Sequence, residues 1–177
     1  LTAGGVTETQ PLVVRKDPNS GGSETEIVAQ TRLLKEVAAD MERAAEAVHR
    51  MERIRVQLDS ITRTVRDTVV TAAARALGQK LIDLEMNLVD LRLTGQGQDG
   101  VRFGSKLISK LGYLANGVAS SDYRPTEQHL EVQALLASGV PPTARSFGGL
   151  VYRQVIEMLR DVRDEQATRA LIAQENR

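Results

Sequence analysis

The two histidines are the side chains of this sequence that could serve most readily as metal ligands or acid–base catalysts, since the chain contains no cysteine. His49 closes the segment Glu46-Ala47-Val48-His49, which has the Glu-x-x-His spacing that di-iron bundles place on two helices. The sequence contains no second copy of this spacing, and His129 stands in no comparable pattern. Because a metal site needs three or four ligands, we expect both histidines to be structural or solvent-facing. The sequence predicts no metal ligand.

A glycine-rich segment, Gly95-Gln96-Gly97-Gln98-Asp99-Gly100, matches the G-x-G-x-x-G pattern of dinucleotide-binding proteins. The mechanism behind that pattern requires a strand before the loop and a helix after it, so that the pyrophosphate meets main-chain donors. Here an apolar helical stripe precedes the loop. We interpret the segment as a connection between helices and predict no cofactor-binding residue.

Among the carboxylates, Glu85 lies close to the apolar stripe formed by Leu81, Leu84 and Leu88. Glycoside hydrolysis would need a second carboxylate facing it. A carboxylate on the flank of a helix, paired with Arg or Lys, is the simpler interpretation. A basic cluster is interleaved with acidic residues and is typical of a solvated face; its members are Arg50, Arg53, Arg55, Arg63 and Arg66. We therefore predict no catalytic residue, and the chain by itself is not expected to be an enzyme.

The composition indicates one domain of ordinary size. The chain has 177 residues, of which 23 are Lys or Arg and 23 are Asp or Glu, so its formal net charge is zero. Nucleic-acid binders usually carry a clustered basic surface, and we expect no nucleic-acid partner. No apolar run approaches the ~20 residues that cross a bilayer, so we expect no transmembrane segment, although a membrane-associated complex stays open.

The elements that would position these residues are mainly helical. A helix over residues 26–60 carries apolar side chains at spacings of three and four, with Arg55 at one of these positions. A turn is expected in residues 60–67, and further helices over 68–94, 101–119 and 127–138. The expected stripes are Leu34, Val37, Met41, Ala44, Val48, Met51, Leu58 and Ile61; then Val70, Ala73, Leu77, Leu81, Leu84, Leu88 and Leu91; then Phe103, Leu107, Leu111, Leu114 and Val118; and then Leu130, Ala134 and Leu135.

The two ends of the chain are expected to interrupt the helical pattern of its middle. Residues 1–18 read as a short β segment, and Asn19-Ser20-Gly21-Gly22 reads as a linker. Pro141-Pro142 should stop or kink the chain before a last helix that restarts near Thr143. The predicted fold is an up-and-down bundle of four to five long amphipathic helices over residues 23–177, preceded by the β segment, which is either the tail of a β-sandwich or a clasp on a partner.

Several short motifs carry a resemblance to one family. They are Thr9–Pro18, Ile54–Leu58, Lys110–Leu114 and Ser121–Gln128. Together they resemble the C-terminal helical region of bacterial secreted β-propeller proteins with sortilin-like (Vps10-type) or BNR/sialidase-like repeats, often labelled glycosyl hydrolases. The resemblance implies a periplasmic or secreted protein whose propeller lies upstream. None of the family's propeller-site residues has a counterpart here, and Pro141-Pro142 departs from the family.

From these observations we expect a non-catalytic structural or docking module of an extracytoplasmic bacterial complex, with protein partners reached through the β segment and the helix faces. Two alternatives stay open. One is the accessory tail of a β-propeller hydrolase-like enzyme whose catalytic part is not in this chain. The other is a cytosolic coiled-coil adaptor. No small-molecule substrate is indicated.

Overall fold

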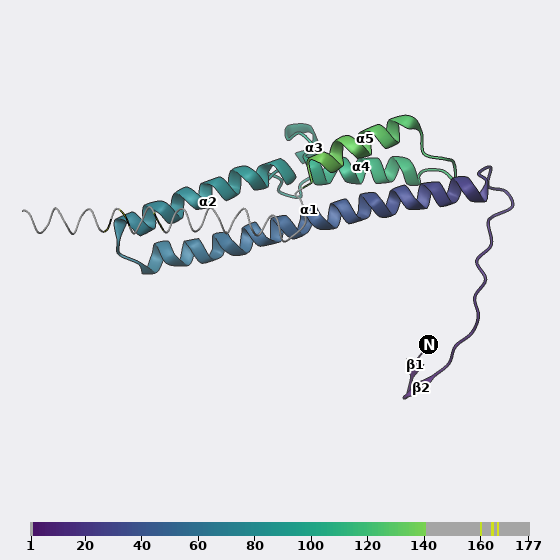
Figure 1. Cartoon of the computed structure of the whole chain (residues 1–177), viewed down its shortest axis with the longest axis horizontal. Helices are drawn as coiled ribbons and strands as arrows, with labels where there is room; N and C mark the ends of the chain where they lie inside the picture. The colour runs from purple at the N-terminus through teal and green to yellow at the C-terminus, as the bar shows by residue number, and fades with distance from the viewer. Residues whose placement is uncertain (1, 141–159, 161–163, 165, 167–177) are drawn as a thin grey trace, which may run out of the picture.

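The computed structural model describes residues 2–140, 160, 164 and 166 (Figure 1). The chain is mainly helical and its helices pack against one another, as the sequence predicted. In chain order the elements are β1 (Thr2–Ala3), β2 (Val6–Thr7), α1 (Glu24–Thr64), α2 (Thr68–Leu88), α3 (Asp99–Arg102), α4 (Leu107–Ala119) and α5 (Glu127–Ser138).

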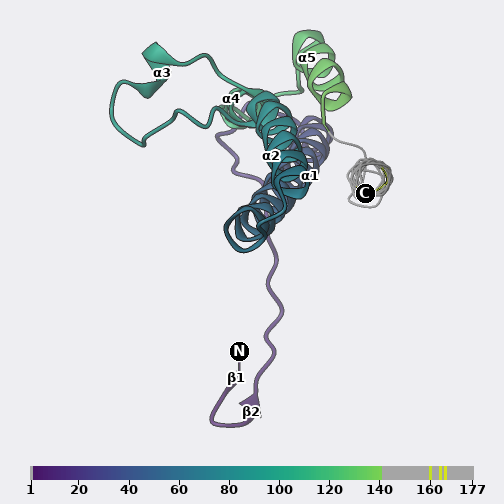
Figure 2. The ribbon, with the colours of Figure 1, turned by 90° about the vertical axis from the view of Figure 1, so that its left-hand side faces the viewer.

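Helix α1 is the spine of the molecule. Its 41 residues span about 60 Å at ~1.5 Å per residue. Helix α2 turns back and packs along the C-terminal part of α1, while α4 and α5 pack along its N-terminal part (Figure 1). The short α3 and the loops beside it project sideways from the bundle (Figure 2). Helices α2 and α4 therefore cover two successive parts of the spine.

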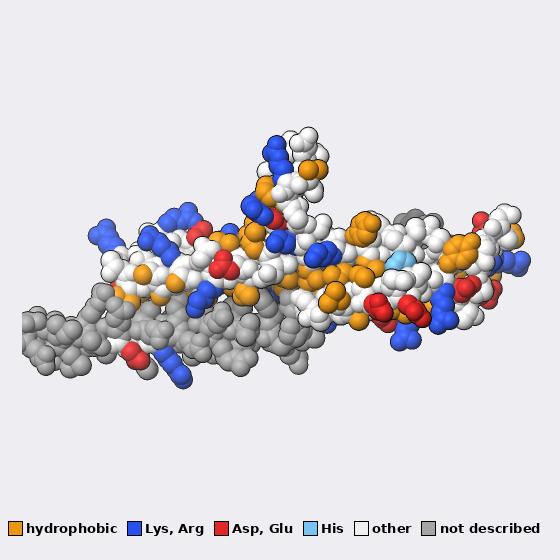
Figure 3. Space-filling model, turned by 90° about the horizontal axis from the view of Figure 1, so that it is seen from above, with side chains coloured by type: hydrophobic (Ala, Val, Ile, Leu, Met, Phe, Trp, Pro, Cys, Tyr) orange, Lys and Arg blue, Asp and Glu red, His pale blue; other side chains and the backbone are white. Residues whose placement is uncertain are grey.

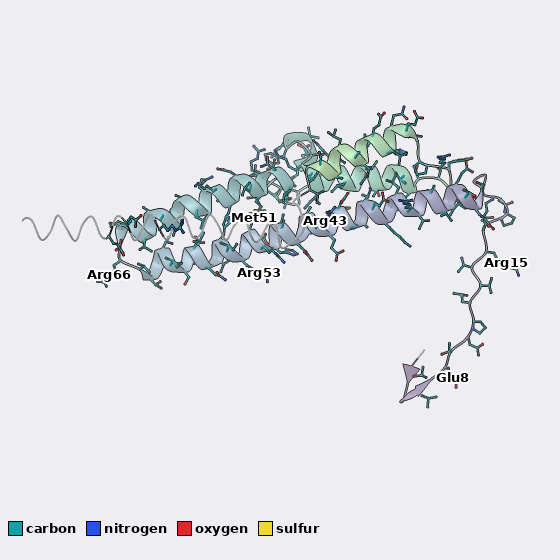
Figure 4. The ribbon with its side chains drawn as sticks, viewed as in Figure 1. Glu8, Arg15, Arg43, Met51, Arg53 and Arg66 are labelled. Carbon is teal, nitrogen blue, oxygen red and sulfur yellow. The ribbon has the colours of Figure 1, made fainter. Side chains whose placement is uncertain are left out.

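The core is a continuous apolar cluster between α1 and its neighbours. Met51, which is fully buried, lies where α1 faces α2 (Figure 4). The buried members of the cluster are Leu33, Val37, Ala47, Met51, Leu58, Ala74, Leu77, Leu81, Leu88, Leu107, Leu111, Leu114, Val118, Leu136 and Val140. Aliphatic residues fill this core because the chain has only 3% aromatic residues.

The seam of α1 follows a heptad, but one of its two rows differs from the prediction. Val37, Ala44, Met51 and Leu58 are buried as predicted, one every seven residues. The second row was predicted at Leu34, Met41 and Val48, which pack against the core but are only partly buried. The residue before each of them is buried more deeply, namely Leu33, Asp40 and Ala47. Spacings of three and four both fit a helical period. The choice between them is made by the side from which the other helices approach.

The ends of α1 and α2 are fixed by side-chain caps. Ser23 caps α1 in a reciprocal capping box with Glu26, in which Glu26 Oε2 accepts from the Ser23 main-chain N–H at 2.8 Å. The predicted turn falls at residues 65–67, because Asp67 Oδ1 accepts from the N–H groups of Val69 (2.8 Å) and Val70 (3.2 Å) and starts α2. A carboxylate here also suits the positive end of the helix.

The stripe predicted for residues 68–94 is partly wrong. Leu77, Leu81 and Leu88 are buried, but Val69 and Ala74 replace Val70 and Ala73 in the interior. Glu85 is buried where Leu84 was expected, and Leu91 lies beyond the helix, which ends at Leu88.

The helix predicted over residues 101–119 is divided in the structure. Only α4 keeps the predicted stripe, with Leu107, Leu111, Leu114 and Val118 buried. Phe103 lies outside it, 4.7 Å from the Arg92 guanidinium carbon to its ring centroid. This cation–π contact holds Phe103 against the loop after α2.

Helix α5 begins as expected and packs differently. Thr126 is its N-cap, but the predicted stripe of Leu130, Ala134 and Leu135 is wrong, since all three are exposed and Leu136 is the buried residue. The helix has apolar residues on two sides, so periodicity alone does not define its inner face. Pro141-Pro142 and the helix expected from Thr143 lie outside the described residues.

The N-terminal β segment is shorter than residues 1–18. A two-residue hairpin pairs β1 with β2 in antiparallel register around Gly4 and Gly5, both of which have positive φ. Residues 8–16 have no regular secondary structure. No helix in the described part of the chain is long and apolar enough to cross a membrane.

Candidate functional site

The most unusual surface feature is the N-terminal arm, which we define as residues 2–18. It leaves the N-terminal end of α1 and runs away from the bundle (Figures 1 and 2). Leu12, Val13 and Val14 are 86%, 75% and 86% exposed. Within the described part of the chain, residues 9–15 form no hydrogen bond. Three consecutive large aliphatic side chains therefore stand in solvent on an unpaired backbone.

The root of the arm, residues 17–22, is held in place by local contacts. Asp17 closes a turn, accepting from Ser20 N at its carbonyl (3.1 Å) and from Asn19 N at Oδ1 (2.8 Å). Gly22 is buried and packs so closely against the corner between α4 and α5 that a β-carbon there would lie 1.5 Å from the carbonyl oxygen of Asp122. A β-carbon on Gly21 would lie 2.8 Å from the hydroxyl oxygen of Tyr123. The arm thus starts from a fixed point.

Buried polar side chains on α1 attach the other helices to the spine. The Gln30 amide donates to the carbonyl oxygen of Val118 at 2.6 Å and to that of Ser121, at the C-terminal end of α4. Asp40, which is 3% exposed, accepts from Arg43 on its own helix and from Gln133 of α5 at 3.2 Å. Sequence analysis missed both residues, and their only signal is a polar side chain at a heptad position.

Glu85 lies inside the core rather than on the flank of its helix. Its Oε2 accepts from Arg55 Nη1 at 2.7 Å, so the predicted pairing with an Arg is present, and the carboxylate is fully buried. Among the residues that the structure describes, its Oε1 has no hydrogen-bond partner. The contact joins one charge from α1 to one from α2 and separates Arg55 from the rest of the predicted basic cluster. Arg53, on α1, and Arg66, in the turn after α1, are both exposed (Figure 4).

The two histidines lie on different helices and have different surroundings. His49 is exposed on α1. His129 completes the α5 capping box: its N–H donates to Thr126 Oγ1 at 3.3 Å, and its Nδ1 accepts from Thr126 N at 3.4 Å. Among the described residues no group of three His, Asp or Glu side chains is placed to hold a metal ion.

The glycine-rich segment forms a loop that is held by hydrogen bonds between its own residues and Thr94. The Asp99 carboxylate accepts from the main-chain N–H groups of Thr94 (2.7 Å) and Gly95 (2.8 Å), and Gly95 has a positive φ. The following helix, α3, has only four residues. The element before the loop is helix α2, so the arrangement lacks the strand that a dinucleotide site requires there.

A second loop contact joins Asp90 to Arg92. The Asp90 carboxylate, 2% exposed, accepts from Arg92 Nε at 2.8 Å and Nη2 at 2.7 Å. These side-chain hydrogen bonds, with one from the Arg92 main chain, lower the pKa of Asp90 to about 2 against the opposing effect of burial. The same Arg92 contacts Phe103, so the pair ties the end of α2 to the segment before α4.

Between α4 and α5 lies a shallow groove of about 530 Å³. Leu114 and Leu136 lie buried at its floor, and Tyr113, Val132 and Leu135 are exposed along it. Its polar lining comes mainly from Lys110, Gln128, His129 and two serines.

Comparisons of this chain with known proteins found no related protein. No family model, no curated protein and no solved structure matches the chain.

Proposed function

We propose that this chain is a non-catalytic docking module that uses its N-terminal arm as a β-strand. The observation that carries the proposal is the exposed, unpaired backbone at Leu12, Val13 and Val14. Aliphatic β-branched residues favour strands, and an extended segment can add to the open edge of a sheet through main-chain hydrogen bonds. Leu12 and Val14 would then face one side of that sheet and Val13 the other.

The bundle supports this role by holding the arm at a defined place. The closely packed Gly22 and the Asp17 turn fix where the arm begins. A strand that starts from a fixed point loses less freedom on binding than a strand on a free tether. The partner is a protein with an exposed strand edge beside an apolar surface. A location outside the cytoplasm follows from the motif resemblance alone.

The test is photo-crosslinking in the producing cell from a photoreactive residue at position 12. We expect a covalent adduct that is lost in Val13→Pro, which removes a main-chain donor, and kept in Val13→Thr, which retains the donor and the branched shape. The matched control places the photoreactive residue at Gln57, an exposed position on α1. If position 12 gives no more adduct than position 57, the arm does not dock.

The mass of the adduct separates two forms of the proposal. An adduct with a second polypeptide supports a docking module in a complex. An adduct within a single longer polypeptide supports the alternative that this region is the accessory tail of a larger protein, with the arm completing a sheet of the same chain.

A further inference from the structure

The α4–α5 face carries an apolar strip that nothing in the described structure covers. We define this face by Lys110, Tyr113, Glu131, Val132 and Leu135. Tyr113 is 82% exposed, Leu135 71% and Val132 42%. Hydrophobic side chains run together along this side of the molecule, seen from above in Figure 3. Large contiguous apolar patches of this kind mark interaction surfaces.

The charges at the two ends of the face have opposite sign. Helices α4 and α5 are antiparallel, since a β-carbon on Gly139 would lie 3.6 Å from Leu107 Cδ1 and one on Gly117 3.7 Å from His129 Nε2. Lys110 therefore lies nearer the end of the helix pair where Leu107 meets Gly139, and the exposed Glu131 lies nearer the end where Gly117 meets His129. Neither forms an ion pair within the described part of the chain.

We propose that two copies of this chain associate through the α4–α5 face about a two-fold axis perpendicular to the groove. Such an axis brings the Lys110 end of each copy onto the Glu131 end of the other, because a two-fold interface repeats every contact twice. The same rotation lays the strip of Tyr113, Val132 and Leu135 against its own copy. A second copy supplies both the apolar surface and the complementary charge that the face requires.

The size of the face sets the strength of this association. Helices of 13 and 12 residues lie side by side, and a face of about 20 by 20 Å gives on the order of 400 Å² per copy. Stable complexes bury about 800 Å² per partner. We therefore expect a weak, reversible dimer whose population rises with concentration.

Sedimentation equilibrium of the full 177-residue chain, over roughly 1 μM to 1 mM, tests for the dimer. We expect a monomer–dimer equilibrium that is lost in Leu135→Asp. Circular dichroism establishes that this variant keeps its helices, which is expected because Leu135 is exposed. A chain that stays monomeric throughout overturns the proposal and leaves the face to another partner. A dimer that Leu135→Asp does not weaken also overturns it.

Charge exchange tests the two-fold geometry. Lys110→Glu and Glu131→Lys should each weaken self-association by roughly tenfold, because two attractive contacts become repulsive in each homodimer. An equimolar mixture of the two variants should associate about as well as the parent chain, since every Lys then faces a Glu. Lys35→Glu on α1 is the matched control and should have no effect. A mixture that associates no better than either variant alone contradicts the proposed axis.

Discussion

Arg55 of α1 and Glu85 of α2 form a charge pair across the helical hairpin, with 2.7 Å between Nη1 and Oε2. Glu85 is fully buried, whereas the Arg55 side chain keeps 33% of its exposure. Thirty residues separate the two along the chain. The pair therefore fixes which turn of α2 meets which turn of α1, in a hairpin whose apolar rows alone would permit slippage by a heptad.

Arg55→Leu should destabilise the fold strongly, because it leaves the Glu85 charge buried without a partner. Removing one partner of a buried pair costs ~3–5 kcal/mol, and we expect the lower end of this range since Arg55 is partly solvated. The double variant Arg55→Leu/Glu85→Leu should recover to within about 1 kcal/mol of the parent. Urea unfolding of the parent, of Arg55→Leu, of Glu85→Leu and of the double variant measures the coupling. Losses in the two single variants that add up to the loss in the double variant would show that the pair carries no energy.

Gln30→Leu should loosen the corner that follows α4. The substitution removes the donor to the carbonyl groups of Val118 and Ser121, and unsatisfied buried acceptors cost ~1–3 kcal/mol. Hydrogen exchange should report faster opening at residues 119–124, together with a lower midpoint in urea. Gln57→Leu, at an exposed position of the same helix, is the control. Unchanged exchange at this corner would contradict the assigned role of Gln30.

The Asp90–Arg92 contact predicts a defined acid response. The pKa of Asp90 is about 2 in the fold and ~3.9 in an unfolded chain. A carboxyl group with a lowered pKa contributes stability above its unfolded pKa and loses it as the pH falls through the folded value. Asp90→Asn should therefore melt below the parent chain at pH 7, and this difference should shrink between pH 4 and 2.

Thermal melts of both proteins across this pH range measure the effect. Asp59→Asn is the matched control, because Asp59 is an exposed carboxylate on α1 whose side chain makes no such contact. A difference between Asp90→Asn and the parent that is the same at pH 2 and pH 7 would refute the assignment.

Gly22→Ala should detach the root of the arm from the bundle. The added β-carbon would lie 1.5 Å from the Asp122 carbonyl oxygen, so the backbone must move. We expect chemical-shift changes at residues 21–23 and 121–124, with little change in the melting of α1 and α2. Gly97→Ala, where a β-carbon meets nothing within 4 Å, provides the control. Unshifted resonances at Asp122 and Tyr123 would show that Gly22 is not packed there.

The sequence was most informative where local physics decides. Ser23, Asp67 and Thr126 are short polar side chains next to a helical pattern, and a cap depends only on the next three residues. The helix predicted from residue 127 begins directly after its cap, Thr126, and the turn at Asp67 fell within the predicted range. The row of Val37, Ala44, Met51 and Leu58 was equally predictable, because a heptad needs no knowledge of the partner helix.

The sequence was least informative where contacts span long separations. Gln30 reaches Ser121 over 91 residues and Asp40 reaches Gln133 over 93. Both polar residues occupy heptad positions, and hydrophobic patterning gives them no place in a core. For the same reason, Glu85 was predicted to lie on the flank of its helix. Their partners become visible only when the other helices are in position.

By itself, then, the sequence determined that this chain is a mainly helical bundle with defined helix starts, because periodicity and capping are properties of neighbouring residues. The tertiary structure alone decided which row of α1 faces inward, that Gly21 and Gly22 are packed against a corner, and that α4 and α5 leave an apolar face exposed. These depend on the side from which a distant segment approaches, and that direction is set by the packing of the whole chain.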